Sequence, residues 1–273
     1  MLGKSGGASP CERARRRPEE RRNRGAIRPR YGPRIICAHP SPLKRPALRG
    51  VPFAGALFNW SPMGDRIDIH PVSPQPRLIQ RAVDALNRGS LLVAPSDAGY
   101  LFAWAIDAVR AEERVQKLRG LDSKHPFTLL CARLSEVGRM AKLDDSAFRI
   151  VKPLVPGPYT FILPVSAELP RRFKQAKRKV IGCRIPDHPV LQALLEAWGS
   201  PLLSTSLELS PEAADESPDR QDAFEVAEHA LRHVDLMLDS GDCPPGPTSV
   251  VDLSGDAPVL VREGAGPVDF LDS

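Results

Sequence analysis

Short apolar runs alternate with stretches of helical periodicity along most of this chain. A short apolar run closed by Gly, Pro or polar residues is typical of a buried strand, whereas apolar residues three and four apart are typical of one helix face. The helical spacing predicts helices over 77–88, 107–119, 136–141, 145–154, 170–176, 188–198 and 222–233. The apolar runs predict strands over 91–95, 101–106, 128–132, 160–165, 180–185, 201–209, 234–238, 249–253 and 258–262. Helices and strands that alternate, with some strands adjacent in sequence, predict an α/β fold with a mixed sheet.

The ends of some predicted helices carry residues suited to those positions. Ser135 and Asp144 are predicted N-caps, because their side-chain oxygens can accept hydrogen bonds from the N–H groups of the first turn. Gly199 is predicted to end the helix over 188–198, since glycine readily adopts the left-handed conformation common at helix ends.

Residues 1–62 lack a sustained hydrophobic period and are rich in Arg and Pro. They hold 14 Lys and Arg against 3 Asp and Glu, whereas residues 63–273 hold 24 against 30. Such a segment cannot bury enough apolar surface to offset its chain entropy, so we predict disorder in 1–62 and one folded domain in 63–273. Three explanations stay open: a basic arm that touches nucleic acid, a targeting peptide, or sequence upstream of the true start. Met63, where the globular pattern begins, favours the last.

Other features of the composition exclude several classes of protein. No apolar run approaches the roughly 20 residues of a membrane span, and the N-terminal stretch lacks the apolar core of a secretory signal. The cysteines are isolated from one another and show no metal-ligand spacing, so we expect reduced thiols, no metal site and a cytoplasmic location. They are Cys11, Cys37, Cys131, Cys183 and Cys243.

The loop after the predicted strand over 91–95 brings several polar groups to the end of a buried element. Its sequence is Ser-Asp-Ala-Gly-Tyr, from Ser96 to Tyr100. Loops at the ends of buried strands commonly bind ligands in α/β proteins. The alternative, an ordinary polar turn, stays open on local grounds.

Cations and hydroxyls are the other candidates for chemistry. Lys117 and Arg119 end a predicted helix, where they either complement the helix dipole or form a clamp for phosphate oxygens. Arg184 lies inside an apolar strand and needs a partner, either a carboxylate of the protein or a ligand anion. Ser204 and Ser206 end an apolar run and can donate to phosphate oxygens or bond to backbone.

Two further features are less specific. A basic stretch precedes the strand over 180–185, and it is either a solvated face or a surface for RNA or nucleotide phosphates. Its members are Arg171, Arg172, Lys174, Lys177, Arg178 and Lys179. His188, alone before Pro189, is predicted to be structural rather than catalytic.

Eight stretches in order resemble the YrdC-like family of threonylcarbamoyl-AMP synthases, and within it the YciO branch. The resemblance covers roughly residues 67–268 and is carried by IDIHPVSPQPRLIQRAV, APSDAGY, KLR, PFTLLC, PGPYTFILP, PRRFKQAKRKVIGCRIPDHPV, PLLSTSL and PTSVVDL. It implies a single YrdC-like domain with a twisted mixed sheet flanked by helices and a concave, basic cavity. It also implies a nucleotidyltransferase that binds ATP with Mg²⁺, L-threonine and bicarbonate. The carbamate of threonine then attacks the α-phosphate and releases pyrophosphate, on the way to threonylcarbamoyladenosine in tRNA.

The resemblance also assigns roles to residues. Lys117 and Arg119 match a Lys-x-Arg pair that acts on nucleotide or carbamate oxygens and are the implied catalytic residues. The implied nucleotide-binding residues are Lys117, Arg119, Thr160, Arg184, Ser204 and Ser206, and the implied substrate-binding residues are Ser96, Tyr100 and Arg184.

Three positions depart from the synthase pattern. Ser206 stands where synthases have Asn, Ala98 replaces a hydroxyl residue, and Leu130 lies where many synthases carry His. Each hydrogen bond lost to a charged substrate costs about 1.5–3 kcal/mol. Three functions therefore stay open: a synthase of this type, a translation-associated module that binds double-stranded RNA or tRNA with little synthase activity, or a hydrolase acting on a related acyl-adenylate.

Overall fold

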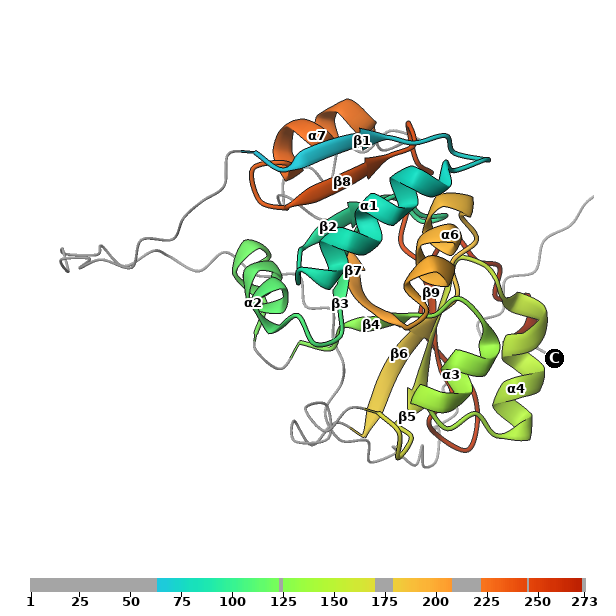
Figure 1. Cartoon of the computed structure of the whole chain (residues 1–273). Coiled ribbons are helices and arrows are strands. Elements are labelled where there is room, and N and C mark those ends of the chain that lie inside the picture. The colour runs from blue at the N-terminus through green and yellow to red at the C-terminus, as the bar shows by residue number, and fades with distance from the viewer. Residues whose placement is uncertain (1–62, 123–124, 170–178, 208–221, 245, 272–273) are drawn as a thin grey trace, which may run out of the picture. The chain divides into compact units, whose positions relative to one another are not determined.

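A computed structural model describes residues 63–122, 125–169, 179–207, 222–244 and 246–271. Ten strands form one twisted open sheet in the order β1-β8-β2-β3-β7-β4-β6-β5-β9-β10 (Figure 1). The strands are β1 (Asp65–Asp68), β2 (Leu92–Ala94), β3 (Leu101–Ala105), β4 (Thr128–Leu130), β5 (Tyr159–Pro164), β6 (Val180–Arg184), β7 (Leu202–Ser206), β8 (Leu236–Asp239), β9 (Ser249–Asp252) and β10 (Val259–Arg262). The described helices are α1 (Pro76–Asn87), α2 (Val109–Leu118), α3 (Leu134–Met140), α4 (Asp145–Val151), α6 (Pro189–Trp198) and α7 (Ala223–Ala230), with short 3₁₀ turns at Lys152–Leu154 and Asp269–Leu271.

The α/β fold with a mixed sheet is confirmed. β1–β8, β2–β8, β4–β6 and β5–β9 pair in parallel, and the remaining neighbours pair antiparallel. The helix predicted over 170–176 and the disordered segment predicted over 1–62 lie outside the described residues.

Two local predictions need correction. β1 has no counterpart among the predicted strands, because Ile67 is the one buried residue in Asp-Arg-Ile-Asp and gives no apolar run. Ser135 is not an N-cap, since α3 begins at Leu134 and the carboxylate of Glu136 accepts from Ala132 N at 2.9 Å instead. Asp144 does cap α4, accepting from Ala147 N at 2.8 Å.

Helices α1 and α6 cover one face of the sheet, which we call the α1/α6 face. They lie side by side in front of β2, β3 and β7 (Figure 1). Their buried Ile, Leu, Val and Ala residues form one core cluster with alternate residues of these strands, such as Leu92, Ala103 and Leu202. Gly199 ends α6 with φ of 74°, a left-handed conformation that glycine adopts without strain.

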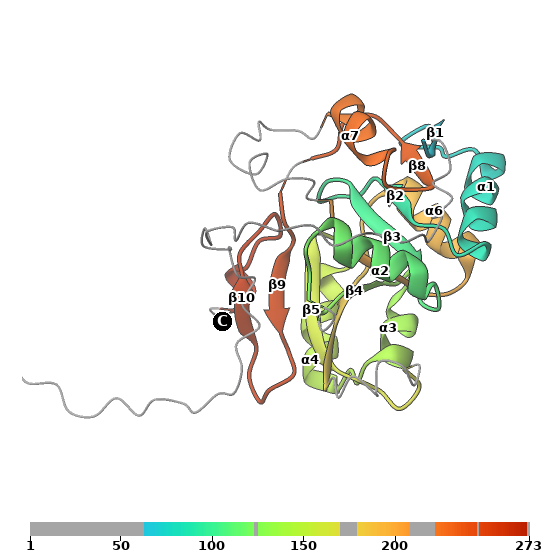
Figure 2. The same cartoon turned by 90° about the vertical axis from the view of Figure 1, so that its left-hand side faces the viewer.

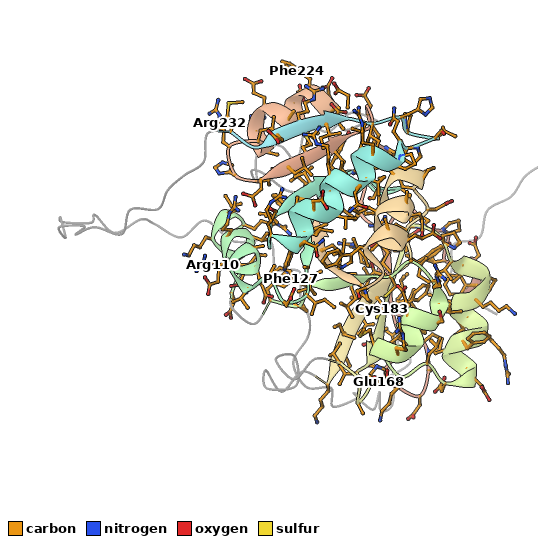
Figure 3. The ribbon with its side chains drawn as sticks, viewed as in Figure 1. Arg110, Phe127, Glu168, Cys183, Phe224 and Arg232 are labelled. Carbon is orange, nitrogen blue, oxygen red and sulfur yellow. The ribbon has the colours of Figure 1, made fainter. Side chains whose placement is uncertain are left out.

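Helices α2, α3, α4 and α7 contribute to the cluster on the opposite face. This cluster includes Phe102, Trp104 and Phe127, all at most 2% exposed. Figure 3 shows Phe127 and Cys183 within the body of the fold, whereas Arg110 on α2 and Phe224 on α7 lie at its periphery. Figure 2 shows β9 and β10 extending the sheet beyond β5, opposite the end that holds α1. The polar side chains described next lie on the α1/α6 face of β7, β4, β6 and β5.

Candidate functional site

A row of two hydroxyl residues and one glycine crosses the α1/α6 face of three central strands. Ser204 on β7 pairs with Thr128 on β4, and Thr128 pairs with Gly182 on β6. Residues directly opposite in a sheet point to the same face, so these three share it. Gly182 adds no side chain there, and a Cβ would fit tightly, 3.3 Å from Thr128 Oγ1 and 3.4 Å from Thr160 Cγ2. Small side chains and hydroxyls at one spot leave room for a ligand and supply donors to it.

Ser204 and Thr160 are both implied by the resemblance, and they lie in this row and beside it, respectively. Ser204 is 4% exposed and its Oγ donates to the carbonyl of Thr128 at 3.2 Å. Thr160 on β5 is 9% exposed, and its Oγ1 lies 2.8 Å from Oγ1 of Thr248, in the segment before β9. Ser206 lies at the exposed end of β7, two residues beyond Ser204 and so on the same side.

Arg184, at the end of β6, has a carboxylate as its partner. Its Nη2 donates to Asp97 Oδ1 at 2.5 Å and to Ser96 Oγ at 3.3 Å. Ser96, fully buried, also donates to the carbonyl of Gly99 at 2.6 Å, which fixes the loop after β2. Within the described part of the chain, Nε of Arg184 and Oδ2 of Asp97 are buried without a hydrogen-bond partner. The pair thus presents one unused donor and one unused acceptor.

A second guanidinium lies near this pair. Arg262 on β10 donates from Nε and Nη2 to the carbonyl of Thr248, at 3.1 and 2.9 Å. Burial lowers the pKa of Arg184, Asp97 raises it, and the like charge of Arg262 lowers it. Like charges favour a nearby anion, and Asp97 supplies one to Arg184. Sequence reasoning missed Thr248 and Arg262, although PTSVVDL belongs to the resemblance and an Arg ending an apolar strand is a signal in itself.

His188 also comes to this region, although the sequence predicted a structural role. It is the N-cap residue of α6 but makes no side-chain capping bond, and its Nδ1 is buried without a partner among the described residues. Burial lowers the pKa of the imidazole, while the carboxylates of Asp97 and Asp187 act in the opposite direction. The sequence places His188 four residues after Arg184, but gave no sign that Asp97 would be nearby.

Tyr100, at the end of the loop after β2, contacts the segment after β8. Its hydroxyl donates to the carbonyl of Gly241 at 2.6 Å and accepts from Ser240 N at 3.3 Å. The side chain is 1% exposed, and burial, Cys243 and Asp239 raise the pKa of the phenol well above its usual range. Tyr100 therefore ties the segment after β8 to the loop after β2, and its implied contact with substrate stays a prediction.

Lys117 and Arg119 lie at the C-terminal end of α2. Lys117 is exposed, and half-buried Arg119 donates from Nη1 to Thr205 Oγ1 at 2.5 Å. Side chains alternate along β7, so Arg119 reaches the side of this strand opposite to Ser204. The structure thus brings Arg119 to β7, and a shared action with Arg184 on one nucleotide stays a prediction.

Several other predictions can be placed in the structure. Leu130 is fully buried in the α1/α6 cluster, and Ala98 lies in the Ser96 turn. Of the basic stretch, Lys179 is described and exposed, and residues 171–178 lie outside the described residues. The concave basic cavity stays a prediction; a pocket of about 350 Å³ is found instead near α1 and β8, lined by Asp65, Arg81, Asp84, Ala85, Arg88, Ser90, Asp235 and Leu236.

No described group of three or more His, Cys, Asp or Glu residues could hold a metal, and no described helix could cross a membrane.

Comparison with known proteins decides the family. Residues 84–264 match the sequence profile of Sua5_yciO_yrdC, described as "Telomere recombination". The chain belongs to the Sua5/YciO/YrdC family. It is 46% identical over 200 residues to the "Uncharacterized protein YciO" of Escherichia coli K12, covering 73% of this chain and 95% of that protein. It is 30% identical over 184 residues to the threonylcarbamoyl-AMP synthase of Mus musculus, covering 64% and 62%.

Solved structures of the Sua5/YciO/YrdC family share the fold. The crystal structure of E. coli YciO matches with a TM-score of 0.68 and 43% identity, covering 76% of this chain and 98% of that one. P. abyssi Sua5 complexed with L-threonine matches with a TM-score of 0.67 and 24% identity, covering 76% and 60%. The resemblance to the YrdC-like family and its YciO branch is confirmed by these matches.

Proposed function

We propose that this chain is a threonylcarbamoyl-AMP synthase, which forms threonylcarbamoyl-AMP and pyrophosphate from ATP, L-threonine and bicarbonate for tRNA modification. The observation that carries the proposal is the buried Arg184–Asp97 pair with one unused donor and one unused acceptor. A free amino acid supplies both complements: its carboxylate accepts from Nε of Arg184, and its ammonium donates to Oδ2 of Asp97. Membership of a family that includes the mouse synthase supports the same reading.

Hydroxyls and a second guanidinium near the Arg184–Asp97 pair could bind the phosphates of a nucleotide. Thr128 and Thr160 flank the position above Gly182. The hydroxyl of Thr160 contacts that of Thr248, whose carbonyl accepts from Arg262, and Ser204 contacts the carbonyl of Thr128. When the carbamate oxygen attacks the α-phosphate, negative charge spreads over phosphate oxygens, and fixed donors and cations stabilise it. Mg²⁺ would enter with the triphosphate as part of the substrate, because magnesium is commonly held by phosphates with few protein ligands.

Pyrophosphate release by the full-length chain tests the proposal. We expect release that requires ATP, L-threonine and bicarbonate together. Lys117→Ala should reduce it at least about tenfold if Lys117 acts on the nucleotide, the loss of one charged contact. Arg110→Ala is the matched control, because Arg110 is an exposed cation on the same helix (Figure 3).

Absence of threonine-dependent release would overturn the proposal. Binding of double-stranded RNA without turnover, unchanged in Lys117→Ala, would instead support the RNA-binding module. That module would depend on the basic stretch over 171–179, most of which lies outside the described residues.

A further inference from the structure

The unused polar atoms of the candidate site include one base. Nε of Arg184 can only donate and Oδ2 of Asp97 is a weakly basic carboxylate oxygen, whereas Nδ1 of His188 can accept a proton near neutral pH. All three are buried and without a hydrogen-bond partner among the residues that the structure describes. Arg184 itself is only 7% exposed. Asp97 pairs with Arg184 and is one of the two carboxylates whose charge acts on His188. A ligand that carries both acidic and basic groups would pair these atoms, because buried polar groups are costly when left unpaired.

The N-terminal turn of α6 also favours binding of a negatively charged group. His188 is its N-cap, and the N–H groups of a first helical turn have no acceptor within the helix. They favour a negatively charged group, as Arg184 does. The carboxylate of a bound amino acid would therefore lie toward Arg184 and α6, which leaves its amine between Asp97 and His188.

We propose that His188 is the base that removes a proton from the substrate amine while Asp97 Oδ2 holds that amine in place. This inference rests on the proposed function. As the C–N bond of the carbamate forms, bicarbonate loses its hydroxyl as water, which carries away one ammonium proton. A second ammonium proton passes to Nδ1 of His188, and the third stays on the carbamate nitrogen. The charges balance: ammonium, bicarbonate and neutral imidazole become carbamate, water and imidazolium.

The surroundings of His188 favour its neutral form before reaction. Burial lowers the pKa of the imidazole from its usual value, and the flanking carboxylates of Asp97 and Asp187 limit that shift. A neutral imidazole with a pKa somewhat below its ordinary value accepts the proton once bond formation acidifies the nitrogen.

A pH profile of His188→Asn tests the role. Asn is a favoured N-cap, so this variant should fold at least as well as the parent. In the wild type, kcat/KM for threonine should fall as pH drops through the His188 pKa, which lies below the usual 6.5. In His188→Asn it should be about 10²–10⁴-fold lower near pH 7 and rise in proportion to hydroxide. His229→Asn, an exposed histidine on α7, is the matched control.

Chemical rescue separates a base from a structural role. Gly is also tolerated at N-caps, so His188→Gly should fold and recover activity when imidazole is added. The role of His188 would be overturned, and the proposed function left standing, if His188→Asn kept the acidic limb of the pH profile. The same holds if imidazole failed to rescue His188→Gly. A wild-type chain that releases no threonine-dependent pyrophosphate would overturn the proposed function and this inference together.

Discussion

Nη2 of Arg184 lies 2.5 Å from Oδ1 of Asp97, which joins the end of β6 to the loop after β2, 87 positions earlier in the chain. Both side chains are nearly buried, with 8% and 12% of their surfaces exposed. A charge taken out of water is costly unless paired, so each residue depends on the other. The pair links the stability of the fold to the shape of the candidate site.

Loss of one partner should destabilise the protein strongly. Arg184→Met leaves the Asp97 carboxylate buried without its cation, so we expect the free energy of unfolding to fall by about 3–5 kcal/mol. Adding Asp97→Asn should restore part of that loss, as urea unfolding of the single and double variants will show. Arg133→Met is the control: its ion pair with Glu196 spans 3.9 Å between side chains that are 64% and 62% exposed. Additive single effects at positions 97 and 184 would contradict a coupled pair.

A methyl group at position 182 should block the nucleotide while leaving the fold intact. The Cβ of Gly182→Ala would lie between the side chains of Thr128 and Thr160, within 3.4 Å of both. We expect ATP affinity, measured by calorimetry, to drop at least about tenfold. The tight contacts should lower the free energy of unfolding by no more than about 1–3 kcal/mol. Gly138→Ala, where nothing lies within 4 Å of the new Cβ, is the control. Unchanged ATP binding in Gly182→Ala would remove this face from the nucleotide site.

The sequence pattern predicted strands at nine places and helices at most places that the structure describes, because apolar runs and helical spacing are local signals. β1 escaped prediction since its register with β8, not its composition, makes it a strand. The candidate site was harder to predict than the strands, because it also depends on how distant segments pair. Ser96, Arg184 and Ser204 were candidates from local pattern, and Thr160 came through the resemblance. The approach of Asp97, His188 and Arg262 depends on strand order. No local pattern contains that order.

Alkaline pH should weaken the fold through its buried thiols. Burial raises the pKa of Cys183 from 9.0 to about 12 and that of Cys243 to about 11. A raised pKa in the folded state gives stability that is complete below the unfolded pKa and is lost as pH rises toward the folded pKa. Each thiol should therefore cost up to about 1.4 kcal/mol per pH unit above about pH 9.

Urea unfolding across this pH range measures that loss. Cys183→Val should flatten the decline up to about pH 12, and Cys243→Val should flatten it only up to about pH 11. Equal slopes in both variants and the wild type would show that other groups control alkaline stability.

Removing the contact between Arg119 and Thr205 tests whether the C-terminal end of α2 belongs to the candidate site. Nη1 of Arg119 donates to Thr205 Oγ1 at 2.5 Å, and Thr205 lies between Ser204 and Ser206 on β7. Thr205→Val removes the acceptor and keeps the side-chain shape, so the guanidinium loses a charged hydrogen bond worth about 1.5–3 kcal/mol. If Arg119 acts on the nucleotide, the variant should lose at least about tenfold in kcat/KM for ATP while KM for threonine changes little.

Ser204→Ala and Arg119→Ala complete this comparison. Ser204→Ala removes a hydroxyl from the other side of β7, so its effect should add to that of Thr205→Val. Arg119→Ala should show no further loss when combined with Thr205→Val if the hydroxyl acts only by holding the guanidinium. An Arg119→Ala variant that turns over at the wild-type rate would assign this arginine to the attachment of α2 to β7, and would leave Arg184 and Arg262 as the cations of the site.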